Sequence, residues 1–316
     1  MKMPAKLPPV RFPNGSLICY TLLTCLPALL LGCAAVKPEP FVKYRTAVQE
    51  AQSGIDAAMS VNYKWTRAGF IESFSGNPES KFSQLVIQQG PNYDWKLPAA
   101  PLYLDIKQTR GALAELNEAF AQYADLLARL SGGDLVSAAK FDQLAKDLNR
   151  NASDALEVLK LSAPAQGGAL FSTVASEAAR LYLEHKRSGY LVKALRTNQP
   201  NVTAYSDLCV SLVQTIRGNI KSYYSDRAEP IRKAWEATTG EKRLKNTEAM
   251  LNLNEQFADA IRVLQALETT YHLLPPAHAD LAKAIEHPKF DMDGVQQLYS
   301  SAKQLEQLGN ELKKSE

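Results

Sequence analysis

The stretch that decides the fold is MLNLNEQFADAIRVLQALETTYHLL, residues 250–274. Its apolar side chains recur every three or four positions, at Met250, Leu253, Phe257, Ala260, Leu264, Leu267, Tyr271 and Leu274. This spacing predicts a helix with one continuous apolar face, and a seven-residue repeat is typical of helical bundles with coiled-coil-like seams. The pair Pro275-Pro276 follows directly, and we expect it to end the helix because proline lacks the backbone donor.

The same spacing extends outward along most of the chain. Apolar faces of this kind occupy residues 41–65 (interrupted at Asn62), 106–130, 141–158, 169–195, 202–238 and 293 onward, with a short helix expected at 277–286. Gly132-Gly133 should end the helix at 106–130, and Pro200 should limit the helix at 169–195. Pro230 should kink or restart the helix at 202–238. The sequence therefore predicts an all-α fold: a long antiparallel bundle of about six long helices plus a short one, with one irregular insertion.

Composition and charge narrow the class of protein. Of 316 residues, 46% are hydrophobic and 22% charged, which is enough to bury a sizeable core and excludes a disordered chain. The formal net charge of +3 comes from Lys2, Lys6 and Arg11, because the residues from 33 onward hold 33 basic and 33 acidic side chains. A neutral chain lacks the electrostatic signature of nucleic-acid binding, so no nucleic-acid partner is predicted.

Residues 1–32 have the pattern of an export signal. Three basic residues precede an interrupted apolar run at 17–31, which closes on Leu30-Leu31-Gly32-Cys33-Ala34. This ending resembles the lipobox of bacterial lipoproteins. The resemblance implies cleavage before Cys33 and acylation of Cys33, whose acyl chains would make the membrane a partner. The alternative is an ordinary secretory signal in which Cys33 is incidental.

The remaining organisation follows from that cleavage point. Residues 33–40 would be a short lipidated tether stiffened by Pro38 and Pro40, and residues 41–316 the helical bundle, with two subdomains conceivable on either side of 196–200. Ala34 occupies the position at which an aspartate commonly retains lipoproteins in the inner membrane. The resemblance therefore favours the outer membrane, facing the periplasm.

The segment 76–101 breaks the helical pattern and is long for a connection in a compact domain, which makes it a functional candidate. An apolar run at 82–88, turn residues at 89–92 and a second short run at 93–97 predict a projecting hairpin. Its large rings are Phe82, Tyr93, Trp95 and Tyr103, which we take as candidate binding residues. Two interpretations stay open: an exposed binding tip, or a loop folded back as a cap on the bundle.

Catalytic patterns are missing from the sequence. The four histidines, His185, His272, His278 and His287, include no pair at a metal-binding helical spacing. Nucleophile elbows, phosphate-binding loops and dinucleotide fingerprints do not occur, so we predict a protein that is not an enzyme and has no cofactor or metal. Cys209 is the one thiol left after the expected processing, and its place on an apolar face predicts a buried core cysteine rather than a reactive one.

The pattern as a whole favours a lipid-anchored envelope scaffold. We expect a non-catalytic helical bundle that docks another cell-envelope component, through the irregular segment or through a bundle face. Two alternatives stay open: a membrane-remodelling or pore-forming helical protein with an apolar tongue, and a helical carrier of an apolar ligand. The sequence does not indicate the oligomeric state.

Overall fold

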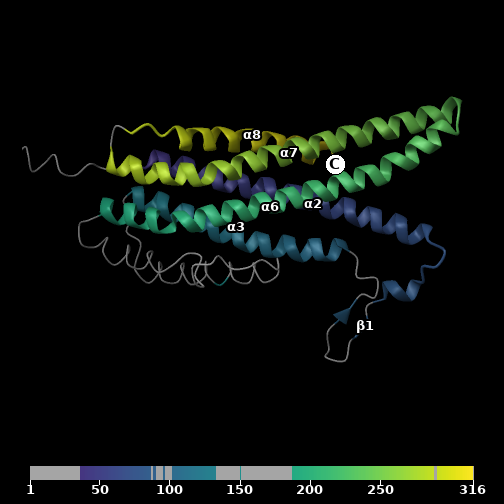
Figure 1. The fold of residues 1–316 in the computed structure, drawn as a ribbon, viewed down its shortest axis with the longest axis horizontal. Helices are drawn as coiled ribbons and strands as arrows, with labels where there is room; N and C mark the ends of the chain where they lie inside the picture. The colour runs from purple at the N-terminus through teal and green to yellow at the C-terminus, as the bar shows by residue number, and fades with distance from the viewer. Residues whose placement is uncertain are drawn as a thin grey trace, which may run out of the picture. The chain divides into compact units, whose positions relative to one another are not determined.

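The computed structural model describes residues 36–86, 88–89, 95–96, 102–132, 150, 187–287 and 290–315. The chain divides into two compact units, Met1–Val36 and Lys37–Glu316, and the helices below belong to the second. They are α2 (Glu39–Gly76), α3 (Leu102–Gly132), α6 (Arg187–Glu236), α7 (Gly240–Glu286) and α8 (Asp293–Ser315), drawn in Figure 1. The all-α class is confirmed. The described part has five long helices instead of the expected six or so. Apart from residue 150, the predicted helix at 141–158 lies outside it, and of the apolar face at 169–195 only residues 187–195 are described, as the start of α6.

Contacts between side chains fix the directions of the helices. Arg45 pairs with Asp125 and Asp56 with Arg110, so α2 and α3 are antiparallel. Tyr224 donates to Asn254, and Gln199, at the other end of α6, donates to Pro275, so α6 and α7 are also antiparallel, as Figure 1 shows.

Helix α2 runs parallel to α6. Trp65 stacks on Tyr223 with ring centroids 4.9 Å apart, and Glu72 pairs with Arg227 about two turns further along α2 and one turn further along α6. Helices α2 and α6 therefore finish at the same end of the second unit. We call that the distal end, and the end at which α2 begins the proximal end.

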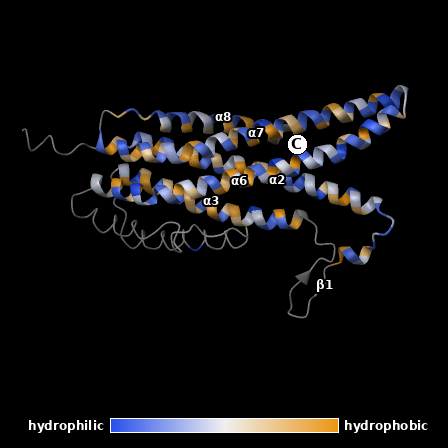
Figure 2. Cartoon of the chain, viewed as in Figure 1, coloured by the Kyte–Doolittle hydropathy of each residue, from blue (hydrophilic) through white to orange (hydrophobic). Residues whose placement is uncertain are grey.

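The predicted apolar faces form the core. In Figure 2 hydrophobic residues recur along every described helix among hydrophilic ones. Fully buried side chains come from all five helices, among them Phe41 and Ile55 of α2, Leu116 and Phe120 of α3, Ile216 of α6, Leu264 and Leu267 of α7, and Leu298 and Leu305 of α8. Asn62, expected to interrupt the first face, is itself buried at 2% exposure, and α2 continues past it.

The prediction that Pro275-Pro276 ends a helix is wrong. Helix α7 passes through both prolines, so the short helix expected at 277–286 is simply its last part. Proline at 275 leaves the carbonyl of Tyr271, four residues earlier, without its helical donor. The hydroxyl of Ser206 in α6 donates to that carbonyl at 2.6 Å, so the neighbouring helix supplies the missing hydrogen bond.

Helix α6 likewise passes through Pro200 and Pro230, where a limit and a kink or restart were expected. It therefore crosses residues 196–200 without a break, and the division into subdomains there stays a prediction. Pro230 lies in an exposed stretch, where water can hydrogen-bond the carbonyl that the proline frees.

The irregular segment is partly described. Residues Phe82–Leu85 form a 3₁₀ helix, held at its start by the Lys81 backbone N–H donating to the Gln84 side chain at 2.8 Å. Strands β1 (Gln88–Gln89) and β2 (Trp95–Lys96) then pair antiparallel. The two short strands agree with the predicted hairpin, but 82–85 is a helical turn and not part of a strand, because the local capping bonds satisfy its backbone.

Helix α8 begins at Asp293, as the pattern predicts, but its cap comes from elsewhere. The Asp280 carboxylate, on α7, accepts the backbone N–H of Gly294 at 3.0 Å. An acceptor at a helix N-terminus satisfies a donor that has no intrahelical partner. This bond ties α8 to α7.

Among the described helices, none is long and apolar enough to cross a membrane.

Candidate functional site

The distal end carries an exposed apolar segment. The 3₁₀ helix follows α2 there, and Phe82 is 80% exposed, with Leu85 and Val86 next to it at 37% and 47%. We call Phe82, Leu85 and Val86 the distal apolar segment. Exposed apolar side chains adjacent to one another are characteristic of interaction sites, whereas single ones are ordinary.

The other candidate binding residues are less fully described. Trp95 lies in β2, directly opposite Gln89, and Tyr103 lies in the first turn of α3, but their side chains are outside the described part. Tyr93 and Cys33 also lie outside the described residues. The candidate set therefore has one member, Phe82, whose side-chain environment is known, and that side chain is turned to solvent.

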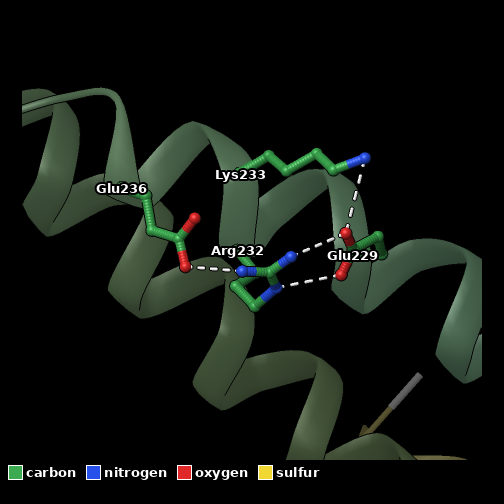
Figure 3. A network of polar contacts seen from close by, with 4 residues as sticks. All are labelled: Glu229, Arg232, Lys233 and Glu236. Atoms are coloured by element: carbon green, nitrogen blue, oxygen red, sulfur yellow. Dashed lines mark hydrogen bonds and ion pairs between the residues drawn. The ribbon is translucent and has the colours of Figure 1, made fainter.

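A second feature of the distal end is the far part of the α6–α7 pair, residues 225–250, which we call the distal hairpin. Figure 3 shows its network of charges: Arg232 pairs with Glu229 and Glu236, and Lys233 pairs with Glu229. The hydrogen bond from Arg232 is the main cause that lowers the pKa of Glu229 to about 2. These side chains are well exposed, so they form the solvated helix face that short interleaved charge runs predict.

The proximal half contains a buried polar network that joins three helices. Tyr123 of α3 lies 2.9 Å from Nε2 of His278, and Nδ1 of His278 lies 2.8 Å from Oε1 of Gln199 on α6. The amide nitrogen of Gln199 donates to the carbonyl oxygen of Pro275 at 3.0 Å. We call Tyr123, His278, Gln199 and Pro275 the buried junction.

The bonds of the junction fix the state of the histidine. Because the amide nitrogen of Gln199 donates to Pro275, its oxygen must accept, so His278 carries its proton on Nδ1 and accepts the Tyr123 hydroxyl proton on Nε2. Burial lowers the pKa of His278 to about 3, which keeps the ring neutral at physiological pH.

Titratable groups near the junction are also held in their uncharged forms. Burial is the main cause that raises the pKa of Tyr44, Tyr205 and Tyr271, and it raises that of Cys209 to about 12. Cys209 is 0% exposed, which confirms a buried core thiol. A neutral thiol and neutral hydroxyls buried among apolar side chains are poor nucleophiles and bases, so this cluster suits a structural role.

Sequence reasoning missed His278 because it stopped the apolar stripe at Leu274. The four- and three-residue steps continue beyond the prolines to His278 and Leu281, which are both fully buried. Had the stripe been followed across Pro275-Pro276, His278 would have been placed at a core position. A histidine there needs polar partners, and the sequence alone does not reveal which residues supply them.

A groove lies between α2 and α3. Its volume is about 370 Å³, and it is lined by Gln49, Gln52, Ser53, Asp56, Met59, Arg110, Leu113, Ala114, Asn117 and Glu118. Arg110 bridges the two helices through two hydrogen bonds to the Asp56 carboxylate, at 2.7 and 2.9 Å.

In the described part of the chain, no cluster of three or more histidine, cysteine, aspartate or glutamate side chains could hold a metal ion. No family model, curated protein or solved structure matches the chain.

Proposed function

We propose that the chain is a lipid-anchored, non-catalytic scaffold that docks another component of the bacterial cell envelope through the distal apolar segment. The observation that carries this proposal is the exposure of Phe82, 80%, beside Leu85 and Val86 on an irregular segment at one end of the helices. Large rings exposed on a rigid support are the usual anchors of protein interfaces.

The placement of this segment supports an anchored role. The cysteine of the proposed lipid anchor, Cys33, precedes α2 by only six residues, whereas the distal apolar segment follows the end of that helix. A helix of 38 residues spans about 57 Å at 1.5 Å per residue. Acyl chains on Cys33 would hold the proximal end close to the lipid, and α2 would provide reach to a partner in the periplasm.

Photocrosslinking in cells tests the docking. We would place a photoreactive residue at Phe82 and, as a matched control, at Val42, which is an exposed apolar residue of α2 near the proximal end. The expected result is one discrete protein adduct from position 82 and none from position 42, at the native level of the protein. No adduct from position 82 together with one from position 42 would contradict the proposal.

The anchor has a separate test. Cells fed an alkyne-labelled fatty acid should label the wild-type chain and should not label Cys33→Ser, and the label should follow the outer-membrane fraction. Equal labelling of both chains would contradict lipidation at Cys33. Because this readout does not depend on a partner, it distinguishes failure of the anchor from failure of the docking.

The pore-forming alternative predicts a different result. A pore-forming chain without its lipid would release dye from vesicles, and a scaffold would not. Leakage by wild type that is lost in Phe82→Ser would favour the membrane-active alternative, because the exposed ring would then be the inserting group.

A further inference from the structure

The turn between α6 and α7 carries a concentration of positive charge. We call residues 231–245, which include the turn and the helix ends beside it, the hairpin tip. The tip holds five cations and two carboxylates, a net charge of +3, whereas the ten residues on either side, 221–230 and 246–255, together have a net charge of −2. The charge along the distal hairpin is therefore polarised toward its tip.

Two cations of the tip have no carboxylate partner. Among the described residues, neither Lys242 nor Arg243 forms an ion pair. Lys245, next to them, pairs with Glu241. The guanidinium of Arg243 lies instead over the ring of Trp235, 3.6 Å from its centroid. Because no neighbouring carboxylate neutralises these two cations, the surface complementary to the tip is an anionic one.

The tip also exposes large apolar side chains beside these cations. Trp235 is 38% exposed, and its indole N–H donates to the Thr247 hydroxyl at 3.0 Å, so the ring is fixed at its edge as well as on its face. Leu244, which follows Arg243 directly, is 58% exposed. Tryptophan and leucine next to lysine and arginine are the composition typical of segments that bind at the boundary between membrane and water.

The shape of the tip favours an extended surface as its partner. Figure 1 shows the turn at the far end of the α6–α7 pair. No side chain from residue 221 to residue 252 is buried, so this part of the pair is exposed to solvent on all sides. A convex, exposed turn offers no enclosed space for a small ligand, but it can lie against a flat surface.

We propose that the hairpin tip docks on the anionic head groups of a lipid membrane. Lys242 and Arg243 face the head-group phosphates, while Trp235 and Leu244 enter the boundary with the acyl chains. A neutral membrane leaves the two cations without partners, and a soluble polyanion leaves the two apolar side chains in water. An anionic membrane satisfies both.

This proposal does not rest on the function proposed above. The docking of an envelope component is assigned to Phe82 and its neighbours, which lie beyond the end of α2, and the anchor is assigned to Cys33. The hairpin tip belongs to α6 and α7. Variants of the tip leave Phe82 and Cys33 unchanged, so the proposals can fail separately.

Hydrogen exchange of the full-length chain tests the docking at the tip itself. We would compare exchange in vesicles of equal parts phosphatidylcholine and phosphatidylglycerol, which are anionic, with exchange in neutral vesicles of phosphatidylcholine alone. Backbone amides of residues 231–245 should exchange more slowly with anionic vesicles only, and amides around His278 should not change. Attachment through the apolar run at 17–31 is common to both samples and does not affect this comparison.

Two charge variants separate the tip from net charge. Lys242→Glu leaves the stacked Arg243 and Trp235 in place and should raise the lipid concentration needed for protection by at least about tenfold. The matched control is Lys221→Glu, at an exposed lysine of α6 outside the tip, which should behave like wild type.

Two leucine variants and a soluble polyanion separate a membrane from other anionic partners. Leu244→Ser should weaken protection by anionic vesicles, whereas Leu251→Ser, at a leucine of similar exposure outside the tip, should not. Inorganic polyphosphate should protect the tip less than anionic vesicles do, because it offers no apolar phase.

Four results overturn the proposal. They are no protection of 231–245 by anionic vesicles, equal protection by neutral ones, equal weakening by a variant of the tip and its control, and full protection by polyphosphate that Leu244→Ser leaves unchanged. The last result would assign the tip to a soluble polyanion.

Discussion

The proximal and distal parts of the α6–α7 pair each contain a proline within a helix, but their polar side chains are paired in different ways. Each has a proline inside α6, Pro200 in one and Pro230 in the other. Next to Pro200, the half-buried Gln199 links the buried His278 to the carbonyl of Pro275 on the neighbouring helix. Around Pro230 the charged side chains are exposed and pair along a single helix, as Figure 3 shows.

This difference indicates where the stability of the pair lies. A buried hydrogen bond is costly to lose because the remaining partner stays desolvated, whereas an exposed ion pair exchanges its bonds with water at little cost. The buried junction should therefore hold the folded state together, and the distal hairpin should open on its own. The predictions below test this contrast, beginning with the largest effect.

Substitution of the central histidine should break the junction. His278→Ala leaves the buried Tyr123 hydroxyl and the half-buried Gln199 amide oxygen without this partner and creates a cavity, so it should lower the free energy of unfolding by about 3–5 kcal/mol. Chemical denaturation followed by circular dichroism measures this loss. The matched control is His272→Ala, an exposed histidine of the same helix, which should change stability by less than about 0.5 kcal/mol. Equal effects of the two substitutions would refute the structural role of the junction.

The same histidine should make stability depend on pH. Its folded pKa of about 3 lies below the usual value of 6.5, so between these values the unfolded chain binds more protons than the folded one. Stability should therefore be complete above pH 6.5 and fall below it by about 1.4 kcal/mol per pH unit.

The informative window is pH 6.5 to 5, above the range in which carboxylates titrate, and there the loss should reach about 2 kcal/mol. Denaturation curves of wild type and His278→Gln at the two pH values measure it. The slope should disappear in the variant, and a slope that persists unchanged would assign the effect to other groups.

The sequence predicts these features unequally. Heptad spacing located the cores of α2, α3, α7 and α8 because burial of one face is a local, periodic requirement. It failed at Pro275 because the hydrogen bond that replaces the lost helical one comes from a side chain distant in sequence. Ser206 reaches the carbonyl of Tyr271 across 65 positions, and no local pattern encodes that contact.

The candidate sites show the same limit. Phe82 was found because an apolar run outside the helical pattern can be recognised from the sequence alone. The buried hydrogen bond of Asn117 was not predicted, because its donor, the Tyr205 hydroxyl, comes from another helix. Helix start residues show it again: Asp293 marks the start of α8, but the carboxylate that caps it belongs to Asp280.

Close packing between α2 and α8 in the proximal half predicts a smaller change in stability than the substitution of His278. A Cβ at Gly54 of α2 would lie 2.8 Å from the Leu305 side chain of α8, so Gly54→Ala should destabilise the fold by about 1–2 kcal/mol. The control is Gly218→Ala in α6, where a Cβ meets nothing within 4 Å, and where helix propensity should stabilise by up to about 1 kcal/mol. The paired measurement is the thermal midpoint, which should fall for the first variant and rise for the second. The same sign for both would show that α2 and α8 do not pack this closely.

The smallest effect on global stability is expected in the distal hairpin. Arg232→Ala removes the pairs with Glu229 and Glu236, but these side chains lie in water and the pairs run along one helix, so the denaturation midpoint should not move measurably.

The change should instead appear as local opening. Backbone amides of residues 225–250 should exchange with deuterium faster in Arg232→Ala than in wild type, while amides around Gln199 and His278 keep the wild-type rate, because the hairpin opens without breaking the junction. Hydrogen exchange read by mass spectrometry resolves the two regions in one experiment. Faster exchange in both would mean that the two halves of α6 and α7 unfold as one unit. The distal hairpin would then not open at a lower free energy than the region of the buried junction.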